Sequence, residues 1–254
     1  MSFRQRLASA APSKETVVTI GVFDGVHQGH RHLLRQVVEL AGDQYVPTVV
    51  TFSNRPITVI RPGTEPNYLT TLDQRVDLIK QQGIEVVVCL EFTPELASVS
   101  AEEFAKLLAD SLKMKGLVMG PDSAIGKDRQ GDLAFMKQQG EELGFWAQTV
   151  ETFEIEGQPV KSRRIREAVS KGNLEVCPEL LGRNYYLSGE VVVGDQRGRT
   201  LGFPTANVEV DPEMLLAGDG IYASWAMIDG KRHQAATSIG VRPTFDLTQR
   251  LVEV

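Results

Sequence analysis

The sequence predicts an α/β protein in which an open, doubly wound parallel sheet is followed by an incomplete antiparallel β-barrel. Two observations predict this fold class. Up to about residue 182, short apolar β-branched runs alternate with helical patterns, which is typical of a parallel sheet with helices on both faces. Beyond that point, strand-like runs follow one another across Gly- and Asp-rich turns, which favours an antiparallel barrel. We therefore expect one domain over residues 1–182 and a second over 183–254.

The first expected strand, residues 17–23, is an apolar run of the kind that a strand buried on both faces needs. A turn rich in Gly, Asp and His separates it from a helical pattern over about 29–40. Leu33, Leu34 and Val37 lie on one stripe of that helix.

Two later helices carry capping signals at their starts. Thr71 stands three residues before Gln74, and Ser100 stands three residues before Glu103, as in a capping box. Gly83 ends the first of these helices. The full set expected for this half comprises strands at 17–23, 45–52, 84–90, 116–120 and 146–150, and helices at about 29–40, 71–82, 100–112 and 133–143.

The second half begins after two short helical segments, at about 163–171 and 174–181. Its expected strands cover residues 186–193, 206–210, 220–228, 233–240 and 251–254, joined by turns such as Asp229-Gly230.

Composition excludes several classes of function. The net charge is −6, with 33 acidic and 27 basic residues, so we expect no nucleic-acid partner. No apolar stretch is long enough to cross a membrane, and we expect no membrane association. Cys89 and Cys177 match no metal-site spacing and suit a reducing cytoplasm, with Cys89 expected to be a buried small hydrophobe. The sequence does not fix an oligomeric state.

The N-terminus lacks the apolar segment of a secretory signal. Because no acidic residue precedes Glu15, a transit peptide stays open as an alternative to a frayed N-terminal arm. We expect the frayed arm, and a cytoplasmic protein.

The turn after the first strand is the strongest chemical signal. Gly25 and Gly29 allow tight turning and close approach of the backbone to a ligand. The helix that follows offers free N–H groups and the positive end of its dipole, which suit a phosphate. His27 and His30 lie three residues apart across the helix start, so both are placed to donate hydrogen bonds to phosphate oxygens. The alternatives are a capping histidine beside an exposed one, and a zinc site that would need further ligands.

A second glycine-rich stretch contains Gly194, Gly198 and Gly202 before the run Pro204-Thr-Ala-Asn207. Such loops expose backbone N–H groups to phosphates. Thr205 and Asn207 alternate along a strand, so they share a face, as two oxygen ligands of Mg²⁺ must. A bulged hairpin without a ligand is the structural alternative.

These segments resemble a known family. The run Gly21-Val-Phe-Asp-Gly-Val-His-Gln-Gly-His30 resembles the FDGVHxGH signature of the HxGH nucleotidyltransferase superfamily, most closely the bacterial bifunctional riboflavin kinase/FAD synthetases. The similarity continues through most of residues 16–254. It implies a Rossmann-like FMN adenylyltransferase domain and a riboflavin kinase barrel, with ATP, FMN and riboflavin as small-molecule substrates and Mg²⁺ as cofactor.

The resemblance also implies roles for individual residues of the first domain. His27 and His30 would bind the ATP phosphates and act in catalysis, within an ATP-binding segment that includes Gly21, Phe23, Asp24, Gly25 and Gly29. Val160-Lys-Ser-Arg-Arg-Ile-Arg166 looks like the family motif ISSTxIR, which implies that Ser162 and Arg166 hold phosphates. Physically, both lie on one face at the start of a helix.

A third stretch, residues 120–127, aligns with the family pattern GxDFRFG. Asp122, Gly126 and Lys127 fit, and we expect Asp122 and Lys127 at the phosphates. The intervening aromatic residues and arginine are absent. The stretch Asn54-Arg-Pro56 is a second departure, because the family usually carries a histidine before the proline.

For the second domain, the resemblance implies Thr205 and Asn207 at Mg-ATP and Glu253 as the base that activates the riboflavin 5′-hydroxyl. Family members continue for several strands beyond this point, so we expect impaired kinase activity and an unfinished barrel.

The leading hypothesis is an FAD synthetase with an associated riboflavin kinase. The alternatives are an adenylyltransferase with a vestigial barrel, a flavin- or nucleotide-binding regulator without turnover, and an HxGH transferase for a pantetheine or nicotinamide nucleotide. The Pro204–Asn207 run argues against the last.

Overall fold

The structure, a computed structural model, describes residues 1–193, 205–241 and 250–254. Packing divides the chain into two units. Unit 1 consists of Met1–Pro66 and Thr70–Lys161, and unit 2 of Asn67–Leu69 and Ser162–Val254. The helices between residues 162 and 181 are thus grouped with unit 2, and the domain boundary at residue 182 stays a prediction.

Unit 1 is built on a five-stranded parallel sheet. Its strands lie in the order β3-β2-β1-β4-β5, and every neighbouring pair is parallel. This confirms the doubly wound parallel sheet, whose strand order reverses between β1 and β4. Ligands of such sheets bind outside the carboxyl ends of the strands at this switch point. The strands are β1 (Thr16–Ile20), β2 (Val46–Phe52), β3 (Val86–Leu90), β4 (Met114–Met119) and β5 (Trp146–Thr149).

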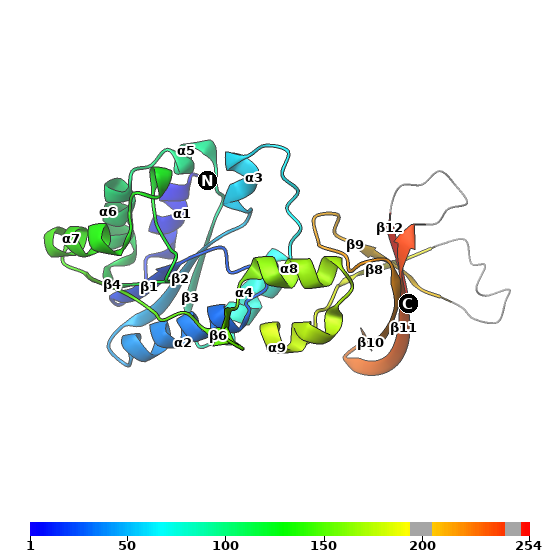
Figure 1. The fold of residues 1–254 in the computed structure, drawn as a ribbon. Coiled ribbons are helices and arrows are strands. Elements are labelled where there is room, and N and C mark those ends of the chain that lie inside the picture. Colours follow the sequence, from blue (N-terminus) through cyan, green and yellow to red (C-terminus); the bar gives the residue numbers. More distant parts are fainter. Residues whose placement is uncertain (194–204, 242–249) are drawn as a thin grey trace. The chain divides into compact units, whose positions relative to one another are not determined.

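Helices cover both faces of this sheet (Figure 1). Alternate residues of β1 show why, since Val18 packs with residues of α1, α6 and α7, and Val17 packs with residues of α2 and α4. The helical segments of unit 1 are α1 (Phe3–Ala10), α2 (Gln28–Ala41), α3 (Pro56–Ile60), α4 (Leu72–Lys80), α5 (Pro94–Ala97), α6 (Ala101–Leu112), η1 (Lys127–Arg129) and α7 (Leu133–Leu143). A short hairpin of β6 (Glu154–Ile155) and β7 (Gln158–Pro159) follows β5.

The capping signals formed as the sequence indicates, with one difference. Thr71 and Gln74 make both hydrogen bonds of a capping box at the start of α4. Ser100 caps α6 by accepting from the Glu103 N–H, whereas the Glu103 carboxylate accepts from Arg4 at 2.6 Å. The Glu103 carboxylate therefore forms a surface ion pair with Arg4 in place of the second hydrogen bond of a capping box.

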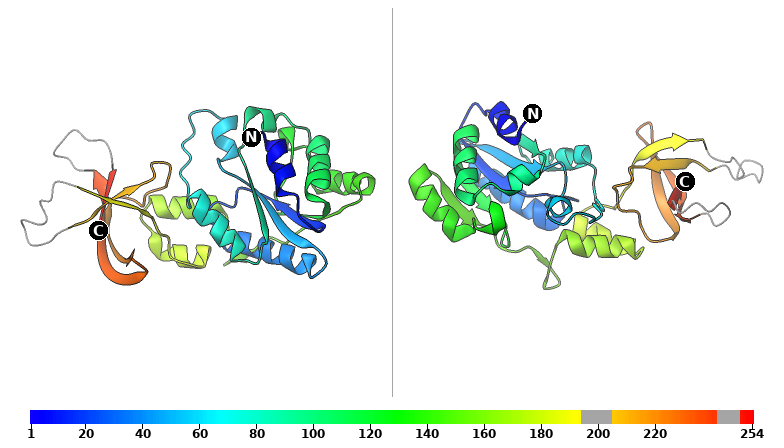
Figure 2. Two further views of the ribbon diagram at one scale, coloured as in Figure 1. Left: turned by 180° about the vertical axis from the view of Figure 1, so that it is seen from behind. Right: turned by 90° about the horizontal axis from the view of Figure 1, so that it is seen from above.

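The expectation of a frayed N-terminal arm is wrong. Residues 3–10 form α1, which has its own capping box from Ser2 and Gln5. Phe3 and Leu7, one turn apart, are buried in the core beside α6, and Figure 2 shows α1 alongside that helix. The pattern was too short to identify from sequence, because two apolar residues in eight define no clear stripe.

Unit 2 joins two short helices to an antiparallel sheet. The sheet order is β10-β11-β12-β9-β8, and its described strands do not close into a barrel, which agrees with the expected incomplete barrel. The elements are α8 (Ser162–Ser170), η2 (Leu174–Val176), α9 (Cys177–Leu181), β8 (Gly189–Val192), β9 (Asn207–Val210), β10 (Gly220–Ile228), β11 (Lys231–Val241) and β12 (Arg250–Glu253).

Both cysteines are free thiols. Cys177 is fully buried in α9, and burial raises its pKa to about 11. Cys89 is only half-buried, so the expectation of a buried hydrophobe is wrong in degree; desolvation nevertheless raises the pKa of its thiol.

No helix among the described residues combines the length and the apolar character that a membrane span requires.

Candidate functional site

The turn after β1 is held by a buried carboxylate. Asp24 is 2 % exposed, and it accepts hydrogen bonds from the N–H and the hydroxyl of Thr70, at 3.2 and 3.3 Å. The Thr70 hydroxyl in turn accepts from the Gly25 N–H at 3.1 Å. Asp24 therefore fixes the path of the turn.

The same turn carries backbone strain. Phe23 and Val26 both have positive φ, at 52° and 38°, which is uncommon for residues with a Cβ. Both are buried, and the edge of the Phe23 ring lies against the ring of His30, with centroids 5.2 Å apart. Such strain persists where packing over-determines it and is common at functional sites.

His27 and His30 lie together at the start of α2. Their rings are stacked, with centroids 3.6 Å apart and an interplanar angle of 17°. His27 is the N-cap of the helix, because its Nδ1 accepts from the His30 N–H at 3.2 Å. The capping hypothesis is thus correct for His27. It also has a chemical consequence, since a neutral imidazole whose Nδ1 accepts carries its proton on Nε2 and is a donor there.

Gly29 allows another part of the chain to approach this pair. A Cβ at Gly29 would lie 3.0 Å from the carbonyl oxygen of Val160 and 3.2 Å from the His27 ring. Farther along α2, His32 packs against Phe153 with ring centroids 5.7 Å apart. The segment before Ser162 therefore runs along the first turns of α2.

The loop after β4 reaches the same place through an ion pair. Lys161 donates to the carboxylate of Asp122 at 2.5 Å, and this contact holds the pKa of Asp122 below its usual range. Arg129 donates to the Asp122 carbonyl at 2.6 Å. Asp122 is thus brought toward the start of α2.

Lys127 has a different environment. It is exposed, and its N–H donates to the Val99 carbonyl at 2.8 Å. Gly126, with φ 77°, packs against Ala101 so closely that a Cβ would lie 2.5 Å from it. None of the contacts described for Lys127 brings it to His27 or His30.

Asn54, the first residue of the departing stretch Asn54-Arg-Pro56, has a defined structural role. Its amide donates to the Phe92 carbonyl at 2.9 Å and accepts from the Phe92 N–H at 2.7 Å. The side chain therefore ties the ends of β2 and β3 together.

Ser162 and Arg166 belong to unit 2, where α8 begins. The Arg166 guanidinium donates through Nε to the carbonyl oxygen of Asn67 at 3.0 Å and is half-buried. Arg163, in the first turn of α8, is exposed.

Two of the predicted kinase residues, Asn207 and Glu253, share one face of the antiparallel sheet. Asn207 lies directly opposite Glu253 in the β9–β12 pair, and Thr205 precedes Asn207 by two positions. Residues opposite each other in such a pair project to the same side, whereas Thr205 lies just before β9 begins. Gly194, Gly198 and Gly202 lie outside the described residues.

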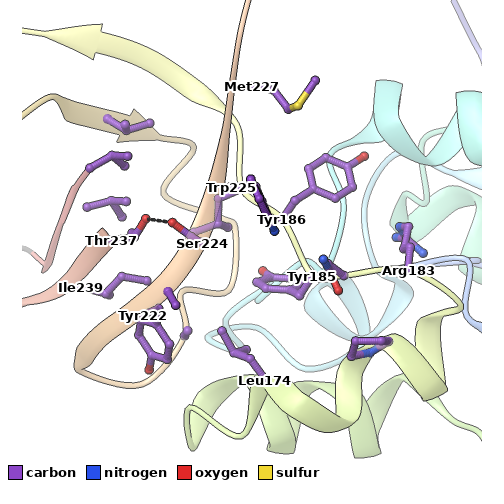
Figure 3. A pocket seen from close by; sticks show the side chains of 18 of the residues that line it. Leu174, Arg183, Tyr185, Tyr186, Tyr222, Ser224, Trp225, Met227, Thr237 and Ile239 are labelled. Carbon is purple, nitrogen blue, oxygen red and sulfur yellow. Dashed lines mark hydrogen bonds between the residues drawn. The ribbon is translucent and has the colours of Figure 1, made fainter. Parts of the chain in front are cut away.

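The other face of this sheet borders a cavity of about 630 Å³ (Figure 3). Val208 and Val252, the neighbours of Asn207 and Glu253, line it. Tyr185, Tyr186 and Trp225 add aromatic rings to its wall, and Ser224 and Thr237 are hydrogen-bonded at 2.7 Å. Asn207 and Glu253 are not among its lining residues, so the cavity and the predicted catalytic face lie on opposite sides of the sheet.

Two residues at the first site had no role in the sequence-based prediction, Thr70 and Lys161. Thr70 stands in Leu69-Thr-Thr-Leu72, where the capping signal of Thr71 drew the interpretation to the helix. Lys161 precedes Ser162 in a basic stretch, and only the structure shows that its partner is the Asp122 carboxylate.

Comparisons with known proteins agree with this geometry. The FAD synthetase family matches residues 9–164, and the riboflavin kinase family matches residues 181–254. The bifunctional riboflavin kinase/FMN adenylyltransferase of Escherichia coli strain K12 is 34% identical over 97% of this chain and 79% of its own length. The protein of that name from Pseudomonas fluorescens is 36% identical over 90% of this chain and 73% of its own.

The chain belongs to the bifunctional riboflavin kinase/FMN adenylyltransferase family. It is an enzyme with an FAD synthetase part and a riboflavin kinase part. A solved structure described as a macrolide-efflux protein from Streptococcus pneumoniae also has this fold. Its TM-score is 0.87 at 30% identity, with 95% of this chain and 79% of that chain covered.

Proposed function

We propose that unit 1 seats the phosphates of ATP at the start of α2 and transfers AMP to FMN. The observation that carries this proposal is the stacked pair of His27 and His30 at the switch point of the parallel sheet. The helix end supplies N–H donors and a favourable dipole, and the two imidazoles add side-chain donors beside it.

In the transfer, an oxygen of the FMN phosphate attacks the α-phosphorus of ATP. The bond from that phosphorus to the oxygen bridging the β-phosphate breaks, and pyrophosphate leaves with the bond's electrons. Negative charge therefore grows on the leaving group. The Nε2–H that capping imposes on His27, and the ring of His30, are the donors that we assign to this charge.

The remaining predicted residues divide into holders of the turn and binders of phosphate. Asp24, through Thr70, and the ring of Phe23 hold the turn. Gly29 leaves room for the Val160 carbonyl, and we retain Gly21 and Gly25 as parts of the ATP-binding segment that the family resemblance implies. We retain phosphate contacts for Ser162, Arg166 and Lys127 as proposals that rest on the family resemblance and their charge.

The kinase reaction, phosphoryl transfer from ATP to the riboflavin 5′-hydroxyl, is assigned to unit 2. Glu253 would accept the hydroxyl proton, and Gly194, Gly198 and Gly202 would receive phosphates. Hydroxyl and amide oxygens on one face fit Mg²⁺, which favours oxygen ligands and completes its shell with water and substrate phosphates. Thr205 and Asn207 would hold the ion, which when bound neutralises phosphate charge.

We also propose that the enzyme works in the cytoplasm with small molecules as its partners. The net charge of −6 and the two free thiols support this assignment.

The direct test incubates the protein with Mg-ATP and either FMN or riboflavin, and separates the flavins by chromatography. FAD formed from FMN supports the adenylyl transfer, and FMN formed from riboflavin supports the kinase reaction. Flavin binding without a new product would contradict both and indicate a regulator.

Residue assignments are tested by His30→Ala, with His32→Ala as the matched control. Both histidines belong to α2, but His32 packs against Phe153. We expect His30→Ala to lower the rate of FAD formation roughly 10²–10³-fold with flavin binding retained, and His32→Ala to leave the rate nearly unchanged. Full turnover by His30→Ala would overturn the site.

A further inference from the structure

The contact between Lys161 and Asp122 is an ion pair beside the proposed phosphate site that the assignments above do not use. It joins the segment beside the start of α2 to the loop after β4. The carboxyl ends of β1 and β4 form the switch point of the sheet. The Lys161–Asp122 pair therefore lies at the border of the proposed phosphate site.

Two observations place the backbone of Lys161 at that border. Val160, its neighbour, is buried, and its carbonyl oxygen lies 3.0 Å from the position of a Gly29 Cβ. The ring of His27 lies 3.2 Å from the same position. The backbone next to Lys161 thus lies against the first helical turn at Gly29, the residue that also borders the capping histidine.

The ion pair itself is open to water. The side chain of Lys161 is 57% exposed and that of Asp122 is 72% exposed. Exposed ion pairs contribute little to stability, because water and salt compete for both charges. A triphosphate carries several negative charges and makes stronger charge-assisted contacts with an ammonium group than one carboxylate does.

We propose that Lys161 is a phosphate-binding residue that exchanges partners, leaving Asp122 for the β- and γ-phosphates of ATP, the future pyrophosphate. This inference rests on the proposed adenylyl transfer. Asp122 then has a definite task, which is to neutralise and orient the ammonium group while no nucleotide is bound. It competes with the nucleotide for Lys161 and does not itself bind phosphate.

The exchange makes an asymmetric prediction. In Lys161→Met, the KM for ATP rises about tenfold because a charge-assisted contact is lost, while kcat falls much less. Inhibition by the product pyrophosphate weakens by a similar factor. Lys161→Arg keeps the charge and recovers most of both effects. In Asp122→Asn the competitor is weakened, so the KM for ATP stays level or falls by about twofold.

Lys115→Met is the matched control. Lys115 also makes an exposed ion pair, with Glu15 at 3.6 Å, but it lies in β4 near the opposite end of the sheet. The KM of the Lys115→Met variant for ATP should equal that of the unmodified protein.

The measurements are steady-state kinetics of FAD formation and calorimetric titration of each variant with inorganic pyrophosphate. Opposite or unequal effects of Lys161→Met and Asp122→Asn support the exchange. Equal losses of ATP and pyrophosphate affinity in both variants would show that the ion pair only supports the local structure, and would overturn the proposal. If the unmodified protein forms no FAD, the proposed function fails, while the pyrophosphate titration still decides the role of Lys161.

Discussion

At the scale of single residues, His27 has an observed structural task and a proposed chemical one. Its Nδ1 caps α2, and this leaves the proton of the neutral ring on Nε2. A substitution that keeps only one of the two tasks can therefore separate stability from activity.

We predict that His27→Asn keeps most of the stability, since asparagine is a preferred N-cap, but loses turnover for want of the imidazole donor. His27→Ala should lose turnover and about 1 kcal/mol of unfolding free energy as well. Urea denaturation and the FAD assay measure the two quantities. Equal stability of the two variants would contradict the capping role.

Asn54, in the stretch that departs from the family pattern, makes local hydrogen bonds that explain its presence. Its two hydrogen bonds with the Phe92 backbone occupy both ends of the amide group. We predict that Asn54→Ala lowers the free energy of unfolding by about 1–3 kcal/mol, because two partly buried backbone groups lose their partners. Denaturant unfolding checks this, and a change within experimental error would show that water replaces the side chain.

At the scale of elements, α1 is the clearest case of a helix supported by tertiary contacts. Leu7 is 0% exposed, and the helix is only eight residues long, too short to be stable alone in water. We predict that Leu7→Ala costs about 2–5 kcal/mol of unfolding free energy. The exposed Ser9→Ala on the same helix serves as control, with a change near zero. Similar midpoints of urea denaturation for both variants would mean that α1 contributes little to the fold.

Prediction from sequence succeeded where local signals and global packing agree. The bounds of α7 and β10 match the expected ranges, since clear turn residues flank both. It failed at α1, where burial of Phe3 and Leu7 depends on a partner helix about 100 residues away. At the candidate site, the two histidines and glycines could be proposed from sequence because they are contiguous in one short segment. Lys161 was missed because its meaning depends on Asp122, a partner far along the chain.

At the scale of the whole molecule, the two units differ in the environment of their single thiols. Cys89 belongs to unit 1 and is half-buried, whereas Cys177 belongs to unit 2 and is buried. The Cys177 thiol has a pKa of about 11 in the fold, above its ordinary value of 9.0. Because the pKa of the Cys177 thiol is raised in the folded state, its contribution to the free energy of unfolding is fully present below pH 9.0. This contribution is lost as the pH rises toward about 11.

We predict that Cys89→Ser, which leaves Cys177 as the single thiol, reacts very slowly with a thiol reagent at pH 8. A pKa of about 11 leaves roughly one thiol in a thousand ionised at that pH. Labelling should accelerate strongly in urea as the α8–α9 region unfolds. Rapid labelling of the native protein would show that α9 opens readily.

The pairing of β1 with β4 has a consequence for the order in which the protein matures. Thr16 lies beside Met114, so the central strands of the sheet come from distant parts of the chain. Such long-range pairs form slowly, because the entropy cost of closing a large loop must be met before any stabilising contact forms. On the ribosome, the histidine turn emerges early, whereas β4 and Lys161 are synthesised much later. All of unit 1 precedes β8 to β12 in the chain, so the proposed adenylyl site is able to assemble while the strands of unit 2 are still being made.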